Sequence, residues 1–166
     1  MINGESILRE QYVGLDEEQY QPAGIDLKLG NIKVFNNKQK VYGIANGVKQ
    51  LPEQEDMQES VVQLGNKKLE VGFLLEPHQP YIAVVKNKVE IPLDTLQLYL
   101  PRSSLLRAGV DVRTAVGDPG FHGHLSFLII NHNDVPFFIQ KGERFAQMIC
   151  IKVQGVEDGY DGDYNE

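Results

Sequence analysis

Residues 118–130 read Asp-Pro-Gly-Phe-His-Gly-His-Leu-Ser-Phe-Leu-Ile-Ile and join a glycine-proline turn to a short apolar run. Glycine and proline mark turns, and a short run of branched and aromatic residues bounded by turns is typical of a β-strand. We therefore predict a strand at Leu125–Ile130. The same alternation recurs along the chain, whose 166 residues include sixteen glycines and eight prolines.

Seven further runs have this character. Strands are expected at Ile25–Leu29, Ile32–Phe35, Leu69–Leu75, Tyr81–Val85, Leu96–Leu100, Phe137–Ile139 and Phe145–Val153. The turns between them are expected at Gly30-Asn31, Gly65-Asn66, Asn87, Asn133-Asp134 and Lys141-Gly142. Two short segments suit a helix, Ser6–Glu10 and Ser103–Ala108, and no segment keeps a helical apolar stripe beyond about three turns. Strands at this spacing predict an all-β sandwich, jelly roll or barrel.

One domain is expected to span residues 1–156. Within it, residues 36–68 are polar, and we predict a hairpin or surface excursion there because neither flank alone would bury a core. Residues 157–166 contain five acidic residues and no basic one. That composition predicts a mobile acidic arm.

The composition excludes several classes of protein. Apolar residues make up 42% and charged residues 23% of the chain, which is typical of a globular domain. The net charge of −7 argues against binding to duplex nucleic acid, which needs a basic face. A single cysteine excludes a disulfide framework. No apolar run approaches the roughly 18 residues of a membrane span, and the N-terminus lacks the apolar core of a signal peptide. A cytoplasmic location without a membrane is therefore expected.

The densest polar cluster is Pro-Arg-Ser-Ser-Leu-Leu-Arg at residues 101–107. A strand end, two hydroxyls, a helix start and two guanidinium groups are the components of a phosphate site. The alternative is a serine N-cap, provided by Ser103 or Ser104, beside two solvated arginines.

Five other positions could carry chemistry. Asp118 is either a general base beside the aromatic ring of Phe121 or the first residue of an ordinary Asx-turn. His122 and His124 lie two residues apart, so on a strand they share a face and could bind a metal ion, although exposed histidines are the usual outcome. The other two are Asp26, a carboxylate that is costly to bury without a partner, and Gln147, an amide in an apolar strand.

Four of these segments occur in a recognisable order. They are Ala-Gly-Ile-Asp-Leu (23–27), Pro-Arg-Ser-Ser-Leu (101–105), Gly-Asp-Pro-Gly-Phe-His-Gly (117–123) and Gly-Glu-Arg-Phe-Ala-Gln-Met-Ile (142–149). This set resembles the motifs of the dUTPase/dCTP deaminase superfamily, and the N-terminal stretch is closer to the dCTP deaminase branch, which includes archaeal dUTPases. The resemblance implies a distorted jelly roll or β-barrel of the dUTPase type that forms a homotrimer, with active sites where subunits meet.

The resemblance also implies roles for individual residues. Asp118 corresponds to the aspartate that orients and deprotonates the attacking water, and Phe121 to the aromatic residue that packs on deoxyribose. Asp26 corresponds to the acid that reaches the triphosphate-bound Mg²⁺ through water. The remaining nucleotide contacts are expected at Arg102, Ser103, Ser104, Arg107, Gly117, Gln147 and Tyr160.

One departure from the family pattern separates the two possible reactions. The position of the deaminase glutamate falls on Leu128, which can neither accept nor donate a proton. The sequence therefore predicts a Mg²⁺-dependent dUTP diphosphatase that forms dUMP and pyrophosphate, limits uracil incorporation into DNA and supplies dUMP for dTTP synthesis. The alternatives are a dCTP deaminase, alone or bifunctional, a nucleotide-binding module without turnover, and a cupin-like metal protein. The arm has Asp163 where the deaminase branch has a cation, so it lacks the charge needed to cap phosphates.

Overall fold

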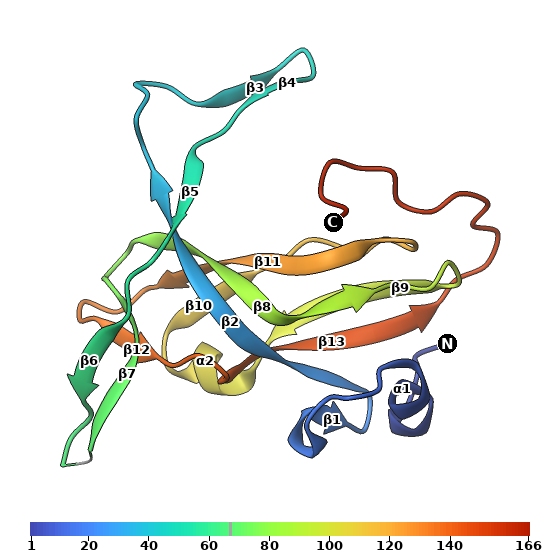
Figure 1. Ribbon diagram of the computed structural model, residues 1–166, viewed down its shortest axis with the longest axis horizontal. Helices are drawn as coiled ribbons and strands as arrows, with labels where there is room; N and C mark the ends of the chain where they lie inside the picture. The colour runs from blue at the N-terminus through green and yellow to red at the C-terminus, as the bar shows by residue number, and fades with distance from the viewer. Residues whose placement is uncertain (67) are drawn as a thin grey trace.

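Strand β2 (Gly24–Asn36) is the strand around which the body is assembled. It pairs antiparallel with β8 (Pro80–Glu90) and β13 (Arg144–Lys152), and at its two ends with β1 (Tyr20–Gln21) and β5 (Glu53–Asp56). These strands belong to a computed structural model that describes residues 1–66 and 68–166 (Figure 1). Because β2 is hydrogen-bonded to strands on both of its edges, it connects the N-terminal strand β1 with β13 near the C-terminus.

The main sheet nearly closes into a barrel. Its central order is β10-β11-β8-β2-β13-β9, with β9 at Thr95–Pro101, β10 at Val110–Arg113 and β11 at His122–Asn131. The two outer strands approach each other, because an isolated antiparallel bridge joins Gln97 on β9 to Gly117, four residues after the end of β10. The all-β prediction of a distorted barrel or jelly roll is confirmed.

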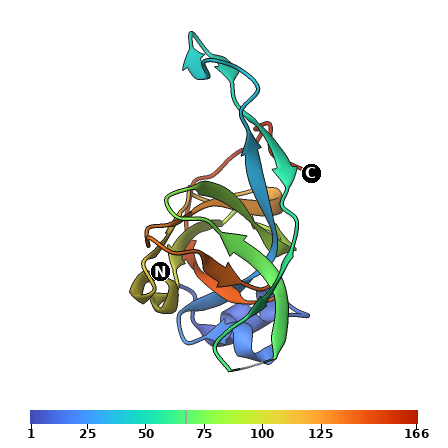
Figure 2. The same ribbon diagram turned by 90° about the vertical axis from the view of Figure 1, so that its left-hand side faces the viewer.

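Two smaller sheets flank the barrel. Strands β6 (Ser60–Gln63), β7 (Leu69–Leu75) and β12 (Phe137–Ile139) form one, while β3 (Gly43–Ala45) and β4 (Val48–Gln50) form a hairpin. That hairpin stands well away from the barrel in both ribbon views (Figures 1 and 2). The polar excursion predicted for residues 36–68 is confirmed for the described part of that range, which leaves out residue 67.

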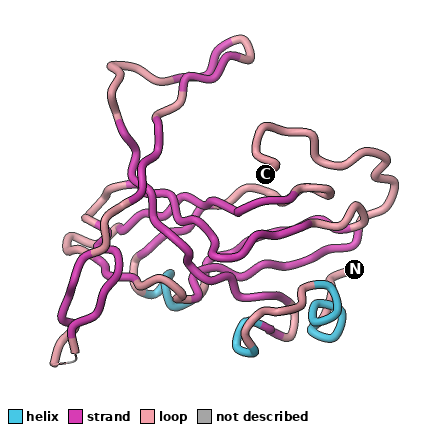
Figure 3. Tube along the Cα trace, viewed as in Figure 1, coloured by secondary structure: helices cyan, strands magenta, loops and turns pink. Residues whose placement is uncertain are grey.

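Helical structure is short. It consists of α1 (Glu5–Gln11), the 3₁₀ turn η1 (Glu17–Gln19) and α2 (Ser103–Arg107), all of which lie beside the strands (Figure 3). Both predicted helices are present. Within the described residues, no helix has the length and apolar character needed to cross a membrane.

The predicted turn at Gly30-Asn31 is wrong. These residues lie inside β2, where the pairing with β8 shifts register between Leu29 and Asn31, so the site is a bulge. A Cβ atom on Gly30 would lie 2.8 Å from the Cα of Lys86. The glycine is therefore needed for the close approach of β2 and β8. A glycine inside a strand pattern is typical of a bulge or of such a close approach, as well as of a turn.

Two other expectations need correction. Asn87 was predicted in a turn but lies within β8, where cross-strand pairing continues to Glu90. Strand β10 was not predicted. Its four residues pair with the far end of β11, and only two of them, Val110 and Val112, are buried. A segment this short carries too little periodicity to be recognised without its partner.

The core is built from alternate residues of the barrel strands. The rings of Phe127 and Phe145 lie with centroids 6.0 Å apart, and the ring of Tyr99 lies 5.0 Å from that of Phe127. Phe145 is fully buried at the start of β13. Because β13 lies between β2 and β9, this aromatic group holds the strands on which the polar residues of the next section are placed.

Phe145→Ala should lower the free energy of unfolding by about 3–5 kcal/mol, because it removes a buried ring and leaves a cavity. Urea denaturation measures this change. Val61→Ala is the control, since Val61 is 62% exposed on β6 and its loss should change stability by no more than about 0.5 kcal/mol. Equal effects of the two substitutions would contradict the placement of the core.

Candidate active site

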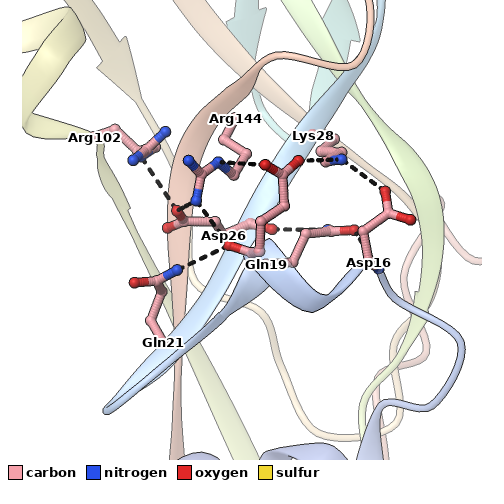
Figure 4. Close-up of polar contacts among 8 residues, drawn as sticks. Asp16, Gln19, Gln21, Asp26, Lys28, Arg102 and Arg144 are labelled. Atoms are coloured by element: carbon pink, nitrogen blue, oxygen red, sulfur yellow. Dashed lines mark hydrogen bonds and ion pairs between the residues drawn. The ribbon is translucent and has the colours of Figure 1, made fainter.

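Two arginines converge on one buried carboxylate at one corner of the barrel (Figure 4). Asp26 lies on β2, and its side chain is only 4% exposed. Its Oδ2 lies 3.3 Å from Nε of Arg102, which follows β9, and 3.3 Å from Nη1 of Arg144 on β13. The register places these residues together, because Gln147 on β13 pairs with Asp26 on one side and with Leu100 on the other.

Burial raises the pKa of Asp26, and the charges of Arg102 and Arg144 oppose that rise. The net direction is upward, so the two arginines do not fully compensate the carboxylate for its loss of water. At neutral pH the charged carboxylate of Asp26 therefore lowers the free energy of unfolding. Such perturbed groups concentrate at functional sites, although structural ion pairs produce them as well.

The N-terminal segment supports this corner from behind. Gln19 donates from Nε2 to the main-chain oxygen of Asp26 at 2.8 Å, and Arg144 donates to the main-chain oxygen of Glu18 at 2.7 Å. Lys28, also on β2, pairs with Asp16 at 2.7 Å and with Glu18 at 2.6 Å. Hydrogen bonds to these two acids raise the pKa of Lys28 and keep it charged.

The serine pair opens α2 without capping it. The N-cap residue is Arg102, with extended backbone and no side-chain capping bond, and Ser103 is the first helical residue. The alternative prediction of a serine N-cap is therefore wrong. Ser103, Ser104 and Arg107 are all exposed, and Ser103 directly follows Arg102 in the chain. Gln147 is half-buried, and its side chain lies against Gly24.

A second group of residues surrounds a pocket of about 620 Å³, which β9 lines through Tyr99 near the middle of the strand. Asp118 and Phe121, from the loop before β11, line this pocket with Tyr160 of the C-terminal arm. The Phe121 and Tyr160 rings meet edge to face with centroids 5.5 Å apart. A volume of this size lies within the range of small-ligand sites.

Asp118 is exposed at this pocket, in a turn closed by main-chain atoms. The N–H of Phe121 donates to the main-chain oxygen of Asp118 at 3.2 Å, a β-turn bond rather than the predicted Asx-turn. Gly117 is held differently, since its N–H and its carbonyl both pair with the main chain of Gln97 at 2.9 Å. Gly117 therefore anchors the loop, and its amide hydrogen is already used.

The acidic arm lies over the pocket in this chain. The N–H of Tyr160 donates to Pro119 at 2.7 Å, and that of Glu166 donates to His122 at 3.1 Å. Two lysines of the body meet its acids: Lys49 lies 3.4 Å from Asp163, and Lys88 lies 3.0 Å from Glu166. Exposed pairs of this kind contribute at most about 1 kcal/mol each, so the predicted mobility of the arm stays a prediction.

The histidine pair is arranged as two separate groups. His122 is exposed, while the Nδ1 of His124 lies 3.0 Å from the main-chain oxygen of Val85. In the described part of the chain, no cluster of three or more His, Cys, Asp or Glu side chains is placed to hold a metal ion.

The strand spacing separates the two groups of polar residues. Gly117 is bridged to Gln97, whereas Arg102 lies five residues further along the extended chain. At about 3.3 Å per residue, these positions are about 16 Å apart. One chain thus carries a cationic corner with Asp26, Arg102 and Gln147, and a separate aromatic pocket with Gly117, Asp118, Phe121 and Tyr160.

Three basic residues of these contacts are not among the predicted site residues: Arg144, Lys49 and Lys88. Arg144 had a detectable signal, because it lies two residues after the Lys141-Gly142 turn, inside one of the four motifs. Lys49 and Lys88 had none, since their contacts with the arm join residues far apart in the chain.

Solved structures with low sequence identity share the fold. A 2′-deoxycytidine 5′-triphosphate deaminase from Agrobacterium tumefaciens matches with a TM-score of 0.65 and 20% identity, over 90% of this chain and 46% of its own. A dUTPase of Staphylococcus bacteriophage 80alpha, solved with dUpNHpp, matches with a TM-score of 0.54 and 16% identity, over 100% of this chain and 92% of its own. The fold is therefore the one that dCTP deaminases and dUTPases have in common.

Sequence comparisons identify the family to which the chain belongs within this fold class. A family model described as dCTP deaminase-like matches residues 4–153, and the chain belongs to that family. A probable deoxyuridine 5′-triphosphate nucleotidohydrolase of Methanopyrus kandleri is 43% identical over 165 residues, 99% of each chain. The protein of the same name from Methanothermobacter thermautotrophicus is 38% identical over 166 residues, all of both chains. A dUMP-forming dCTP deaminase of Methanobrevibacter smithii is 31% identical over 137 residues, 81% of this chain and 67% of its own.

Asp26→Asn should raise the melting temperature at pH 7. Burial raises the pKa of Asp26, so its folded environment favours the neutral carboxyl. The stabilisation from that neutral form is present below the unfolded value of about 3.9 and is lost as the pH rises through the folded value. Asparagine is neutral throughout.

Calorimetry at pH 7 and at pH 3 measures the effect. The difference between variant and wild type should be present at pH 7 and close to zero at pH 3, where both side chains are uncharged. A lower melting temperature of the variant at pH 7 would show that the arginines outweigh the cost of burial.

Proposed function

We propose that this chain is a dUTP diphosphatase, in which water attacks the α-phosphorus and the products are dUMP and pyrophosphate. The observation that carries the proposal is the exposed carboxylate of Asp118 at the aromatic pocket, in a chain with Leu128 at the deaminase glutamate position. The two archaeal relatives named for this hydrolysis support it over nearly their whole lengths. A buried reduced cysteine, Cys150, suits a cytoplasmic enzyme.

Asp118 acts on the water in this mechanism. Its carboxylate accepts a proton from the water as the oxygen attacks, and the bond from the α-phosphorus to the bridging oxygen of pyrophosphate breaks. Phe121 packs on the sugar, and the exposed rim of the pocket leaves room for the base. The arginines and serines of the cationic corner bind phosphate oxygens, whose negative charge must be neutralised.

Mg²⁺ suits this corner only as an ion carried by the substrate. Asp26 is one carboxylate between two arginines, which is not a cage for a bare cation. Magnesium usually keeps several waters and binds substrate phosphates with few protein ligands, so Asp26 fits a contact through water. When bound, the ion supplies charge neutralisation to the triphosphate.

A homotrimer would bring the two groups of residues together. One chain separates Asp118 from the cationic corner along β9, so a triphosphate held at the corner needs the aromatic pocket of a neighbouring subunit. The outer face of β9 and β13 supports this assembly. It carries five apolar residues, Leu96, Leu98, Leu100, Ile149 and Ile151, next to Gln147 of the cationic corner, and Leu98 and Leu100 are 37% and 52% exposed.

Asp118→Asn should lower the rate of dUTP hydrolysis by roughly a hundredfold or more, because removal of a general base costs about 10²–10⁴ in rate. Pyrophosphate release with Mg²⁺ present measures it. Asp134→Asn is the control, since the side chain of Asp134 is 98% exposed and pairs with His78 far from the pocket. Full activity in Asp118→Asn would refute the proposal.

The same samples decide between the alternative functions. Ammonia from dCTP should be absent, and its release would overturn the argument from Leu128 in favour of a deaminase, alone or bifunctional. Tight dUTP binding by calorimetry without pyrophosphate would instead identify a binding module without turnover.

Leu98→Lys combined with Leu100→Lys should shift the sedimenting species from trimer to monomer, because two charges cannot be buried in an apolar contact. Activity should fall at least about tenfold if the site is shared between subunits. Val61→Lys, on exposed β6, should leave both the assembly and the rate unchanged. A fully active monomer would refute the shared site.

A further inference from the structure

A buried hydrogen-bond chain lies directly beneath the loop that carries Asp118. Tyr99, on β9, donates from its hydroxyl to Oε1 of Gln97 at 2.6 Å. Gln97 is fully buried and donates from Nε2 to the hydroxyl of Tyr12 at 2.7 Å. Tyr12 follows helix α1 and also meets the sulfur of Cys150 at 3.6 Å. These hydrogen bonds thus connect the end of the N-terminal helix, through the barrel interior, to the loop.

The upper end of this chain touches the loop in two ways. The main chain of Gln97 makes both bonds of the bridge with Gly117, each 2.9 Å long. The hydroxyl of Tyr99 lies so close below Gly117 that a Cβ atom there would be 2.1 Å from it. The backbone of Gly117 therefore packs directly against the Tyr99 hydroxyl. Asp118 is the next residue, so this contact also limits where its backbone can lie.

The loop is fixed on its other side by the main chain of Ile91, which directly follows β8. The N–H of Gly120 donates to Ile91, and Ile91 donates to Phe121, both at 2.9 Å. Between these anchors, the turn exposes the carboxylate of Asp118. The position of the loop backbone at Gly117 thus depends on Gln97 and Tyr99. The position of its second part, Gly120 and Phe121, depends on main-chain hydrogen bonds to Ile91.

The protonation of this chain is well defined. Burial raises the pKa of Tyr99 and of Tyr12 above the usual tyrosine value, so both hydroxyls keep their protons at neutral pH. Burial is the main cause of the rise at Tyr99, and the charge of Asp118 adds to it. In the structure the Tyr99 hydroxyl donates to Oε1 of Gln97 and Nε2 of Gln97 donates to Tyr12, so both polar atoms of the buried amide have a partner.

We propose that Gln97 and Tyr99 are positioning residues for Asp118, and that Tyr12 extends their support to the N-terminal helix. This inference rests on the proposed function, in which Asp118 activates water. Gln97 is fully buried, whereas Tyr99 is 4% exposed and lines the pocket. The hydroxyl of Tyr99 is bonded to Gln97 rather than directed to a nucleotide. The contribution of Gln97 and Tyr99 is to fix the backbone position of Gly117 and therefore that of the neighbouring Asp118. This matters for the rate, because displacement of a reacting group by about 1 Å can cost on the order of a hundredfold.

The decisive variant is Tyr99→Phe, which removes one oxygen, leaves Oε1 of Gln97 without its donor and takes away the atom on which Gly117 rests. Its kcat for dUTP should fall roughly 10- to 100-fold, while KM stays within about twofold, because phosphate, sugar and base contacts are unchanged. Gln97→Leu and Tyr12→Phe should act in the same direction.

Tyr81→Phe is the matched control. Tyr81 is buried to 6% exposure on β8, and its hydroxyl accepts the N–H of Glu76 instead of contacting the loop. The control should lose some thermal stability without a change in kcat. Equal losses of kcat in Tyr81→Phe and Tyr99→Phe would mean that general destabilisation explains the effect, and would overturn the inference.

Amide hydrogen exchange gives a second readout that needs no activity. Peptides covering residues 115–121 should exchange at least about tenfold faster in Tyr99→Phe than in wild type or Tyr81→Phe. Unchanged exchange there, or a wild-type kcat, overturns the inference. If wild type releases no pyrophosphate while Tyr99→Phe still speeds exchange, the proposed function fails and the positioning of the loop stands.

Discussion

The antiparallel row formed by Asp26, Gln147 and Leu100 determines most of what this structure can do. Strand β13 lies between β2 and β9, and this row fixes the register of all three strands. A slip of one residue would turn every side chain of a strand to the opposite face. The carboxylate would then leave its two arginines, and the outer aliphatic residues of β9 and β13 would enter the core.

Charge is distributed unevenly between the two groups of site residues. The cationic corner gathers Arg102 and Arg144 on a single buried acid, so it has positive charge available to a phosphate when Asp26 engages another partner. The aromatic pocket instead gathers acids, since Asp118 lies there with Asp163 and Glu166 of the arm. A triphosphate would be attracted by the first group and repelled by the second, which is consistent with the proposed division between phosphate binding and water activation on different subunits.

Local signals in the sequence were sufficient for much of the fold. The apolar runs around Leu125–Ile130 and Phe145–Val153 carry the alternation of half-buried strands, and both are strands in the structure. Errors occurred where long-range contacts override local preference. Gly30 permits the close approach of β8 instead of a turn, and Ser103 does not cap α2 because Arg102 already occupies the N-cap position. For the site, the motifs located Asp26, Arg102 and Asp118, but the second arginine on Asp26 required the register of β13.

Strand periodicity and side-chain chemistry are local properties, so an all-β domain, an acidic chain and residues able to perform phosphate chemistry could be predicted from the sequence. The folded structure was needed to show that Arg144 contacts Asp26, that the Asp118 loop lies away from that corner along β9, and that buried hydrogen bonds join Tyr12, Gln97 and Tyr99. These arrangements depend on strand order, register and burial. Each of those arises from contacts between segments that are distant in the sequence, so no local pattern records them.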